Sequence, residues 1–130
     1  ITHSQPGVIT HRIVLEKADG KSYPTRTLEE QLEIKSLDAI FFSCSFENDF
    51  IHLVRMLDAA GIPVLRRDRG SLPLILIGGI APTGNPEPLA NVADAILITV
   101  FGGSGFLGRH VVRALAKRGY RIRVAVRRPD

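Results

Sequence analysis

Apolar residues along the chain gather in short runs that alternate with segments of helical periodicity. Continuous apolar runs are typical of strands that are buried on both faces of a parallel sheet. Such runs occupy residues 38–44, 73–78 and 94–101. Two further stretches, 8–16 and 121–127, are rich in β-branched residues in rough alternation, which also favours strands. The pattern therefore predicts about five strands.

Helical periodicity is clearest at residues 48–60 and 106–118. Thr27 and Glu30 have the spacing of a capping box, which predicts a short helix ending near Lys35. Residues 80–88 are so rich in proline and glycine that we expect a loop there, before a short helix near 89–92. Strands and helices thus alternate. The sequence predicts a single α/β domain, a three-layer sandwich around a mainly parallel sheet of about five strands.

Composition fits such a domain. The chain has 130 residues, of which 45% are hydrophobic and 23% charged, an ordinary balance for a globular protein that buries one core. No apolar run approaches the roughly 20 residues of a membrane helix, and no signal peptide is visible. The single cysteine, Cys44, excludes an intramolecular disulfide. We expect a soluble, cytoplasmic protein without a membrane partner.

The net charge of +4 could suggest nucleic acid, but the basic excess is concentrated between Arg109 and Arg128, where no acidic residue occurs. Aromatic residues do not interleave with these charges, so we expect no nucleic-acid partner. We attribute the excess of basic residues to a solvated helix face and to the pair of arginines after it, which would bind phosphate. An exposed edge of a parallel sheet would also favour a homodimer.

A glycine-rich turn follows the strand 94–101. Gly102, Gly105 and Gly108 fit G-x-x-G-x-x-G, while Gly103, Gly105 and Gly108 fit G-x-G-x-x-G, so the register stays open. Glycines at these positions allow a tight reversal and a close approach of backbone N–H groups to a pyrophosphate at the start of the next helix. The predicted nucleotide site comprises Gly102, Gly103, Ser104, Gly105, Phe106, Leu107 and Gly108.

Residues 99–130 resemble the first Rossmann unit of the extended and atypical short-chain dehydrogenases, also called epimerase/dehydratase-like proteins. In that family the residue that ends the second strand selects the cofactor, and here this residue is Arg127 or Arg128. The resemblance thus implies NADP as the ligand in preference to NAD, because a guanidinium matches phosphate. The family's catalytic Tyr-x-x-x-Lys pair is missing, since Thr27 and Val124 lie four residues after the two tyrosines.

Residues 1–98 resemble a second family, the cobalamin-binding domains that precede radical S-adenosylmethionine (SAM) enzymes. The likeness runs from about residue 38 to 98, where the chain reads DAIFFSCS and later GGIAPTGNPEPLA, and it is most specific through NPEP at residues 85–88. It implies a flavodoxin-like fold that holds the corrin over the carboxyl ends of its strands. The residues there are Ser43, Cys44, Ser45, Gly78, Gly79, Thr83 and Asn85.

Two motifs of that second family are missing. The chain has no Asp-x-His-x-x-Gly sequence for a lower axial histidine, and no Cys-x-x-x-Cys-x-x-Cys cluster motif, so radical chemistry is not expected from this polypeptide. The two resemblances meet inside the strand 94–101, whereas natural fusions usually join at linkers. We therefore interpret residues 1–98 and 99–130 as the two parts of an engineered or recombined chimera. The alternative is a natural domain.

Catalytic residues do not form a recognisable set. Cys44 lacks a base, because His52 lies about two helical turns away with no spacing that ties the two together. His3 and His11 have no third ligand at metal spacing. We therefore predict no enzyme activity and no metal site. Three hypotheses remain: a non-catalytic scaffold that binds NADP or NAD, a cobalamin-binding domain, and a chimera that folds but binds no ligand.

Overall fold

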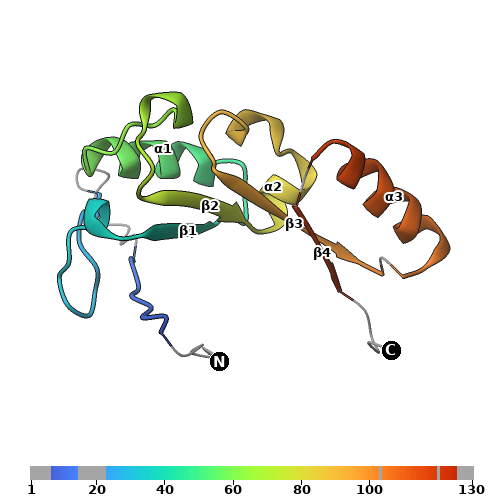
Figure 1. The fold of residues 1–130 in the computed structure, drawn as a ribbon, viewed down its shortest axis with the longest axis horizontal. Helices are drawn as coiled ribbons and strands as arrows, with labels where there is room; N and C mark the ends of the chain where they lie inside the picture. Colours follow the sequence, from blue (N-terminus) through green and yellow to red (C-terminus); the bar gives the residue numbers. More distant parts are fainter. Residues whose placement is uncertain (1–6, 15–22, 103, 120, 126–130) are drawn as a thin grey trace.

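Four parallel strands form the sheet of the computed structural model, which describes residues 7–14, 23–102, 104–119 and 121–125. The strands lie side by side in chain order (Figure 1). They are β1 (Ala39–Ser43), β2 (Leu74–Gly78), β3 (Ala95–Phe101) and β4 (Arg121–Ala125). Three helices join them: α1 (Asp49–Ala59), α2 (Ile80–Gly84) and α3 (Phe106–Lys117). Short 3-10 turns occupy Ile34–Ser36, Arg66–Asp68 and Glu87–Leu89.

The predicted α/β fold with a parallel sheet is confirmed, and so are both long helices and four of the strands. The strand predicted for 8–16 is wrong over residues 8–14, which lie outside the sheet; residues 15 and 16 are outside the described part of the chain. Val8, Ile9 and Val14 are exposed, so their alternation reflects no buried face. This segment is held by a backbone bond, in which Leu28 N donates to Arg12 O at 2.8 Å.

The described helices all lie on one side of the sheet (Figure 1). Right-handed crossovers that add each new strand on the same side of the one before place their helices on the same face of the sheet. A second helical layer would need the strand order to reverse, and the order β1-β2-β3-β4 does not. The described residues therefore form two layers, and the third layer of the predicted sandwich is not found among them.

The core lies between the sheet and α1, where the helix-facing residues of the strands are fully or nearly buried. Burial of such branched side chains contributes about 1.5–3 kcal/mol each. The buried core residues include Ile40, Ile75, Ile77, Ile96 and Ile98 from the strands and Leu53, Met56 and Leu57 from α1. The other face of the sheet is less covered, and Phe41 on it is 56% exposed.

Thr27 does not cap a helix, so the predicted helix from Thr27 to Lys35 is wrong. The hydroxyl of Thr27 accepts a hydrogen bond from Leu32 N at 3.1 Å, and Thr27 N donates to Leu32 O at 2.9 Å. Gln31 adopts a left-handed φ of 56°, and Arg26 forms an antiparallel bridge with Glu33. A threonine hydroxyl can bond to the backbone of a turn as readily as to that of a helix, and here the turn is adopted.

The loop predicted for residues 80–88 contains a helix, α2, over its first five residues. Pro82 lies in the first turn of α2, where its missing N–H costs no hydrogen bond, so proline content did not exclude a helix there. The short helix expected near 89–92 is a 3-10 turn that lies earlier, at Glu87–Leu89.

Candidate functional site

The glycine turn between β3 and α3 has the tight geometry expected of a phosphate-binding turn. Gly102 has a φ of +68°, which favours glycine. Gly105 N donates to Gly102 O at 3.0 Å, and a Cβ on Gly105 would lie 3.2 Å from that oxygen. The strand, turn, helix and strand follow in the predicted order. Gly103, which decides between the two glycine registers, lies outside the described residues.

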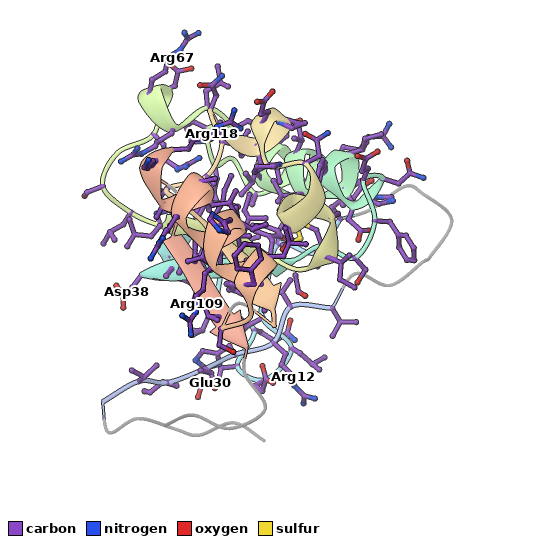
Figure 2. The ribbon with its side chains drawn as sticks, turned by 90° about the vertical axis from the view of Figure 1, so that its right-hand side faces the viewer. Arg12, Glu30, Asp38, Arg67, Arg109 and Arg118 are labelled. Carbon is purple, nitrogen blue, oxygen red and sulfur yellow. The ribbon has the colours of Figure 1, made fainter. Side chains whose placement is uncertain are left out.

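The amino end of α3 favours an anion. Gly105 is the N-cap residue, no side-chain hydrogen bond caps the helix, and the first turn has no acidic residue. The backbone N–H groups of a first helical turn have no partner within the helix and carry the positive end of its dipole. Arg109, near the start of α3 (Figure 2), adds a positive charge. Its Nε donates a hydrogen bond to Ser104 O at 2.7 Å, which holds the guanidinium beside the turn. This end of α3 can therefore bind a phosphate.

The turn opens toward solvent. Phe106 is 84% exposed and Leu107 is 74% exposed, and the Phe106 ring meets His110 edge-on with 5.0 Å between ring centroids. The structure thus brings Gly102, Ser104, Gly105, Phe106, Leu107 and Gly108 together at one accessible turn. Arg127 and Arg128 lie outside the described residues, so their role in selecting NADP stays a prediction.

A second cluster forms where β1 and β2 end. Cys44 N donates to Gly78 O at 2.8 Å, and Cys44 O accepts a hydrogen bond from Ala81 N at 3.2 Å. These bonds place the loop after β1 directly against Gly79. The residues that the second resemblance singled out do gather here, at the carboxyl ends of the two strands: Ser43, Cys44, Ser45, Gly78, Gly79, Thr83 and Asn85.

Many polar groups of this second cluster are already bonded within the protein. Asp49 Oδ2 accepts hydrogen bonds from Ser45 N at 2.7 Å and from Phe46 N at 2.9 Å. The Thr83 hydroxyl donates to Gly79 O at 2.7 Å, and Asn85 Nδ2 donates to a carboxylate oxygen of Glu47 at 3.5 Å. A ligand here would meet the exposed Ser43, Ser45 and Asn85.

The role of Asp49 in holding the loop after β1 was not predicted from the sequence. The available signal was an acidic residue at the start of a predicted helix, five positions after the end of the predicted strand 38–44. Such side chains often accept hydrogen bonds from nearby backbone N–H groups.

The thiol of Cys44 is buried, and its ionisation is disfavoured. The residue is 2% exposed, and burial together with the negative charge of Asp49 raises the pKa of its thiol to about 11. Because the thiolate is the reactive form, we expect alkylation by iodoacetamide at pH 7.5 to be at least about 100-fold slower in the native protein than in urea. Mass spectrometry of timed samples measures both rates. Equal rates would contradict the buried position.

Metal ligands do not converge in the described part of the chain, where no three His, Cys, Asp or Glu side chains gather in a way that could hold an ion. His52 is engaged with Tyr23, at 3.0 Å between Nδ1 and the phenol oxygen, and His3 lies outside the described residues. None of the helices that are described is long and apolar enough to cross a bilayer.

Comparison with known proteins gives a family match and a short match to a curated protein. The family model described as "Radical SAM proteins, N-terminal" matches residues 4–115, from near the start of the chain across the glycine turn into α3. A protein named ceramide reductase from Caulobacter vibrioides is 59% identical over 32 residues, which cover 25% of this chain and 10% of that protein. The chain thus spans only a tenth of the length of this relative. No solved structure matches.

Proposed function

The chain belongs to the family of radical SAM N-terminal domains. We propose that it is a non-catalytic ligand-binding domain whose ligand is a dinucleotide held by its phosphates. The site is the turn from Gly102 to Gly108. The observation that carries this proposal is the uncapped, acid-free amino end of α3 behind a tight glycine turn, with the Arg109 guanidinium beside it. This arrangement provides backbone donors and positive charge for a phosphate.

NADP is the proposed form of the ligand, with NAD as the weaker alternative. The basis is Arg127 and Arg128, which follow β4 in the sequence, since a guanidinium pairs with a 2′-phosphate. The short likeness to a protein named as a reductase supports the same choice, because reductases commonly take their hydride from a nicotinamide dinucleotide. The proposal that residues 1–98 and 99–130 have separate origins rests on the two sequence resemblances alone, and the family match, which runs to residue 115, crosses the proposed junction.

Cobalamin is the second candidate ligand. It is favoured by one observation, that the ends of β1 and β2 bring the seven residues of the second cluster to one edge of the sheet. Its test is direct, because bound cobalamin should co-elute with the protein and carry its visible absorption. A domain that binds neither ligand would instead support a chimera that folds without a ligand.

Titration with NADP, NAD and 2′-phospho-ADP-ribose tests the nucleotide proposal. Amide resonances of Gly102, Ser104 and Gly105 to Gly108 should shift with NADP, and NADP should bind about tenfold more tightly than NAD, since one charge-assisted contact is worth about 1.5–3 kcal/mol. Unmoved amides at millimolar ligand would refute the site. Equal affinities for NAD and NADP would refute the role of Arg127 and Arg128.

A matched pair of glycine variants separates binding from folding. Gly102 and Gly61 both have a φ of +68°, and a Cβ on either would meet no atom within 4 Å. Gly102→Ala and Gly61→Ala should therefore cost a similar amount of stability, about 1 kcal/mol each. Only Gly102→Ala should weaken NADP binding, by about tenfold or more, because the added methyl group obstructs the approach of the phosphate to the backbone.

A further inference from the structure

Helix α3 carries positive charge along its outer face. Arg109, Arg113 and Lys117 follow one another at intervals of four residues, which places them on one side of the helix, and we name them the cationic stripe. All three are exposed. None of them takes part in an ion pair within the described part of the chain, and no aspartate or glutamate occurs in residues 95–129. The positive charge of the stripe is therefore not neutralised by a neighbouring carboxylate.

An apolar tip lies at the start of this stripe. It consists of Phe106 and Leu107, the first two residues of α3, whose side chains leave most of their surface in solvent. Arg113 follows Phe106 by seven residues and Lys117 follows it by eleven, spacings close to two and three helical turns, so Phe106 lies in line with the cationic stripe. Large apolar side chains that are exposed next to each other are typical of contact surfaces.

The stripe lies on the side of α3 that points away from the sheet. Gly108, Val112 and Leu115 are half-buried and form the opposite side of the helix, where Leu115 packs against the core. No residue of α3 is buried. The outer face of α3 is therefore open to a partner, and it is a convex surface without a groove, which suits a broad and flat partner better than a small molecule.

We propose that α3 docks on a bilayer that contains anionic lipids. The cationic stripe lies over the lipid phosphates, and Phe106 and Leu107 insert below the headgroups. Helices that bind at a membrane interface combine cations with phenylalanine or leucine side chains in this way. A nucleic acid would also attract the stripe, but it would not account for the apolar tip. The sequence-based expectation of no membrane partner rested on the lack of a spanning segment, which a peripheral contact does not require.

Sedimentation with sucrose-loaded vesicles tests this proposal on the whole chain without nucleotide. Binding to phosphatidylcholine vesicles that contain about one-third phosphatidylglycerol should be at least about tenfold tighter than binding to phosphatidylcholine alone, because each lysine or arginine near an anionic surface strengthens binding about fivefold. Salt at about 0.5 M should remove most of this difference, since it screens the charges. Equal binding to both kinds of vesicle, or no binding to either, overturns the proposal.

A matched pair of double variants tests the cationic stripe. Arg113→Gln with Lys117→Gln should lower the affinity for anionic vesicles about 25-fold, because two cations are lost. Both residues lie outside the turn from Gly102 to Gly108, so failure of this test leaves the nucleotide proposal standing. Lys35→Gln with Arg67→Gln is the control, because it removes the same charge from exposed side chains in the 3-10 turns before β1 and β2. The control should change the affinity by less than about twofold, since these charges lie far from α3 and are screened. Equal losses in the two double variants would assign the binding to net charge and overturn docking through α3.

A second pair of variants tests the apolar tip. Phe106→Ala should lower the affinity for anionic vesicles about tenfold, because a buried aromatic ring is lost from the contact. Ile9→Ala is the control, since Ile9 is 81% exposed and lies in the segment outside the sheet, and its affinity should be unchanged. Thermal unfolding confirms that each variant folds. If Phe106→Ala binds as tightly as the native protein, the proposal is wrong. Displacement from the vesicles by duplex DNA at an equal concentration of phosphate would identify a nucleic-acid surface and would also overturn it.

Discussion

Replacing Gly79 by alanine is expected to destabilise the protein by about 3–5 kcal/mol, which would leave little of the stability of a small domain. Gly79 has a φ of 113° and a ψ of −172°, a backbone region that is essentially restricted to glycine. A Cβ there would lie 2.2 Å from Cys44 O and 2.9 Å from Cys44 N. The clash is with backbone, so a change of side-chain rotamer cannot relieve it.

Cys44 cannot move away either, because its backbone is bonded on both sides. Its N–H donates to Gly78 O, and its carbonyl accepts from Ala81 N. Relief would therefore cost hydrogen bonds at the carboxyl ends of β1 and β2. Urea unfolding followed by circular dichroism measures the loss of stability. The urea concentration at the midpoint should fall, and the dependence of the unfolding free energy on urea should stay unchanged.

Gly84→Ala is the control for this substitution. Gly84 ends α2, its φ is not in the left-handed region, and an added Cβ meets nothing within 4 Å. We expect its stability to change by less than about 1 kcal/mol, because alanine is the better helix former. If Gly79→Ala and Gly84→Ala lose similar amounts of stability, the close approach of Cys44 does not require glycine at position 79.

Elements that are specified by residues close together in the chain could be predicted from the sequence. The apolar runs that became β1, β2 and β3 are buried on at least one face, and the periodicity of α1 reflects its packing against the sheet. The glycine turn was predictable for the same reason, since its geometry depends on neighbouring residues. Residues 8–14 show the limit of such signals, because alternation of apolar residues does not specify a partner strand.

Features that depend on distant contacts could not be predicted. The need for glycine at position 79 arises from the approach of Cys44 O, 35 residues earlier in the chain. The hydrogen bonds of Asp49 to the loop after β1 could only be suspected from its place at a helix start. Strand order, which decides that the helices share one face, leaves no local mark in the sequence.

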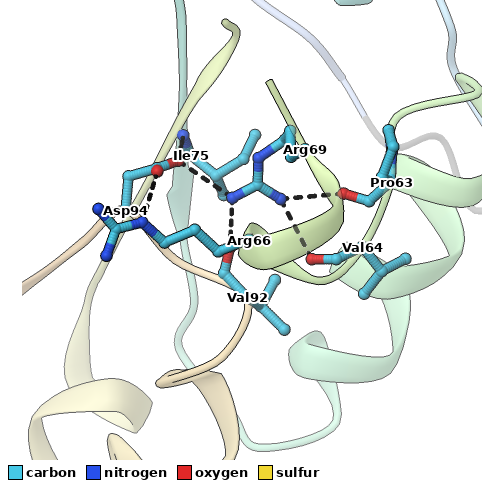
Figure 3. Close-up of polar contacts among 7 residues, drawn as sticks. All are labelled: Pro63, Val64, Arg66, Arg69, Ile75, Val92 and Asp94. Atoms are coloured by element: carbon cyan, nitrogen blue, oxygen red, sulfur yellow. Dashed lines mark hydrogen bonds and ion pairs between the residues drawn. The ribbon is translucent and has the colours of Figure 1, made fainter. Parts of the chain in front are cut away.

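A buried ion pair, Arg69 with Asp94, joins the connection before β2 to the start of β3 (Figure 3). The Arg69 side chain is 2% exposed, and its guanidinium donates to Asp94 Oδ2 at 3.0 Å and to Val92 O at 2.6 Å. It also donates to the carbonyls of Pro63 and Val64. Asp94 Oδ2 in turn accepts a hydrogen bond from Ile75 N at 2.8 Å. One arginine thus satisfies three backbone carbonyls and a carboxylate.

Arg69→Met should cost about 3–5 kcal/mol, because it leaves a largely buried carboxylate and three carbonyls without this donor. Arg67→Met is the control, because the Arg67 side chain is 80% exposed and its ion pair with Asp68 is 3.7 Å long. This variant should lose no more than about 0.5 kcal/mol of stability. The urea midpoints of unfolding measure the loss of stability in both variants. A loss below about 1 kcal/mol in Arg69→Met would mean that water replaces the guanidinium.

The pair also predicts a dependence of stability on pH. Burial by itself would raise the pKa of Asp94, but the hydrogen bond from Ile75 N and the guanidinium groups of Arg69 and Arg66 outweigh it, so the pKa lies below its ordinary value of 3.8. A carboxylate with a lowered pKa in the folded state stabilises that state above its unfolded pKa, and this contribution is lost as the pH falls through the folded value. Unfolding midpoints between pH 6 and pH 2 should therefore fall steeply below about pH 4 in the native protein. In Asp94→Asn the curve should be flatter over this range, because the titrating group is gone, and an unchanged slope would place the acid sensitivity in other carboxylates.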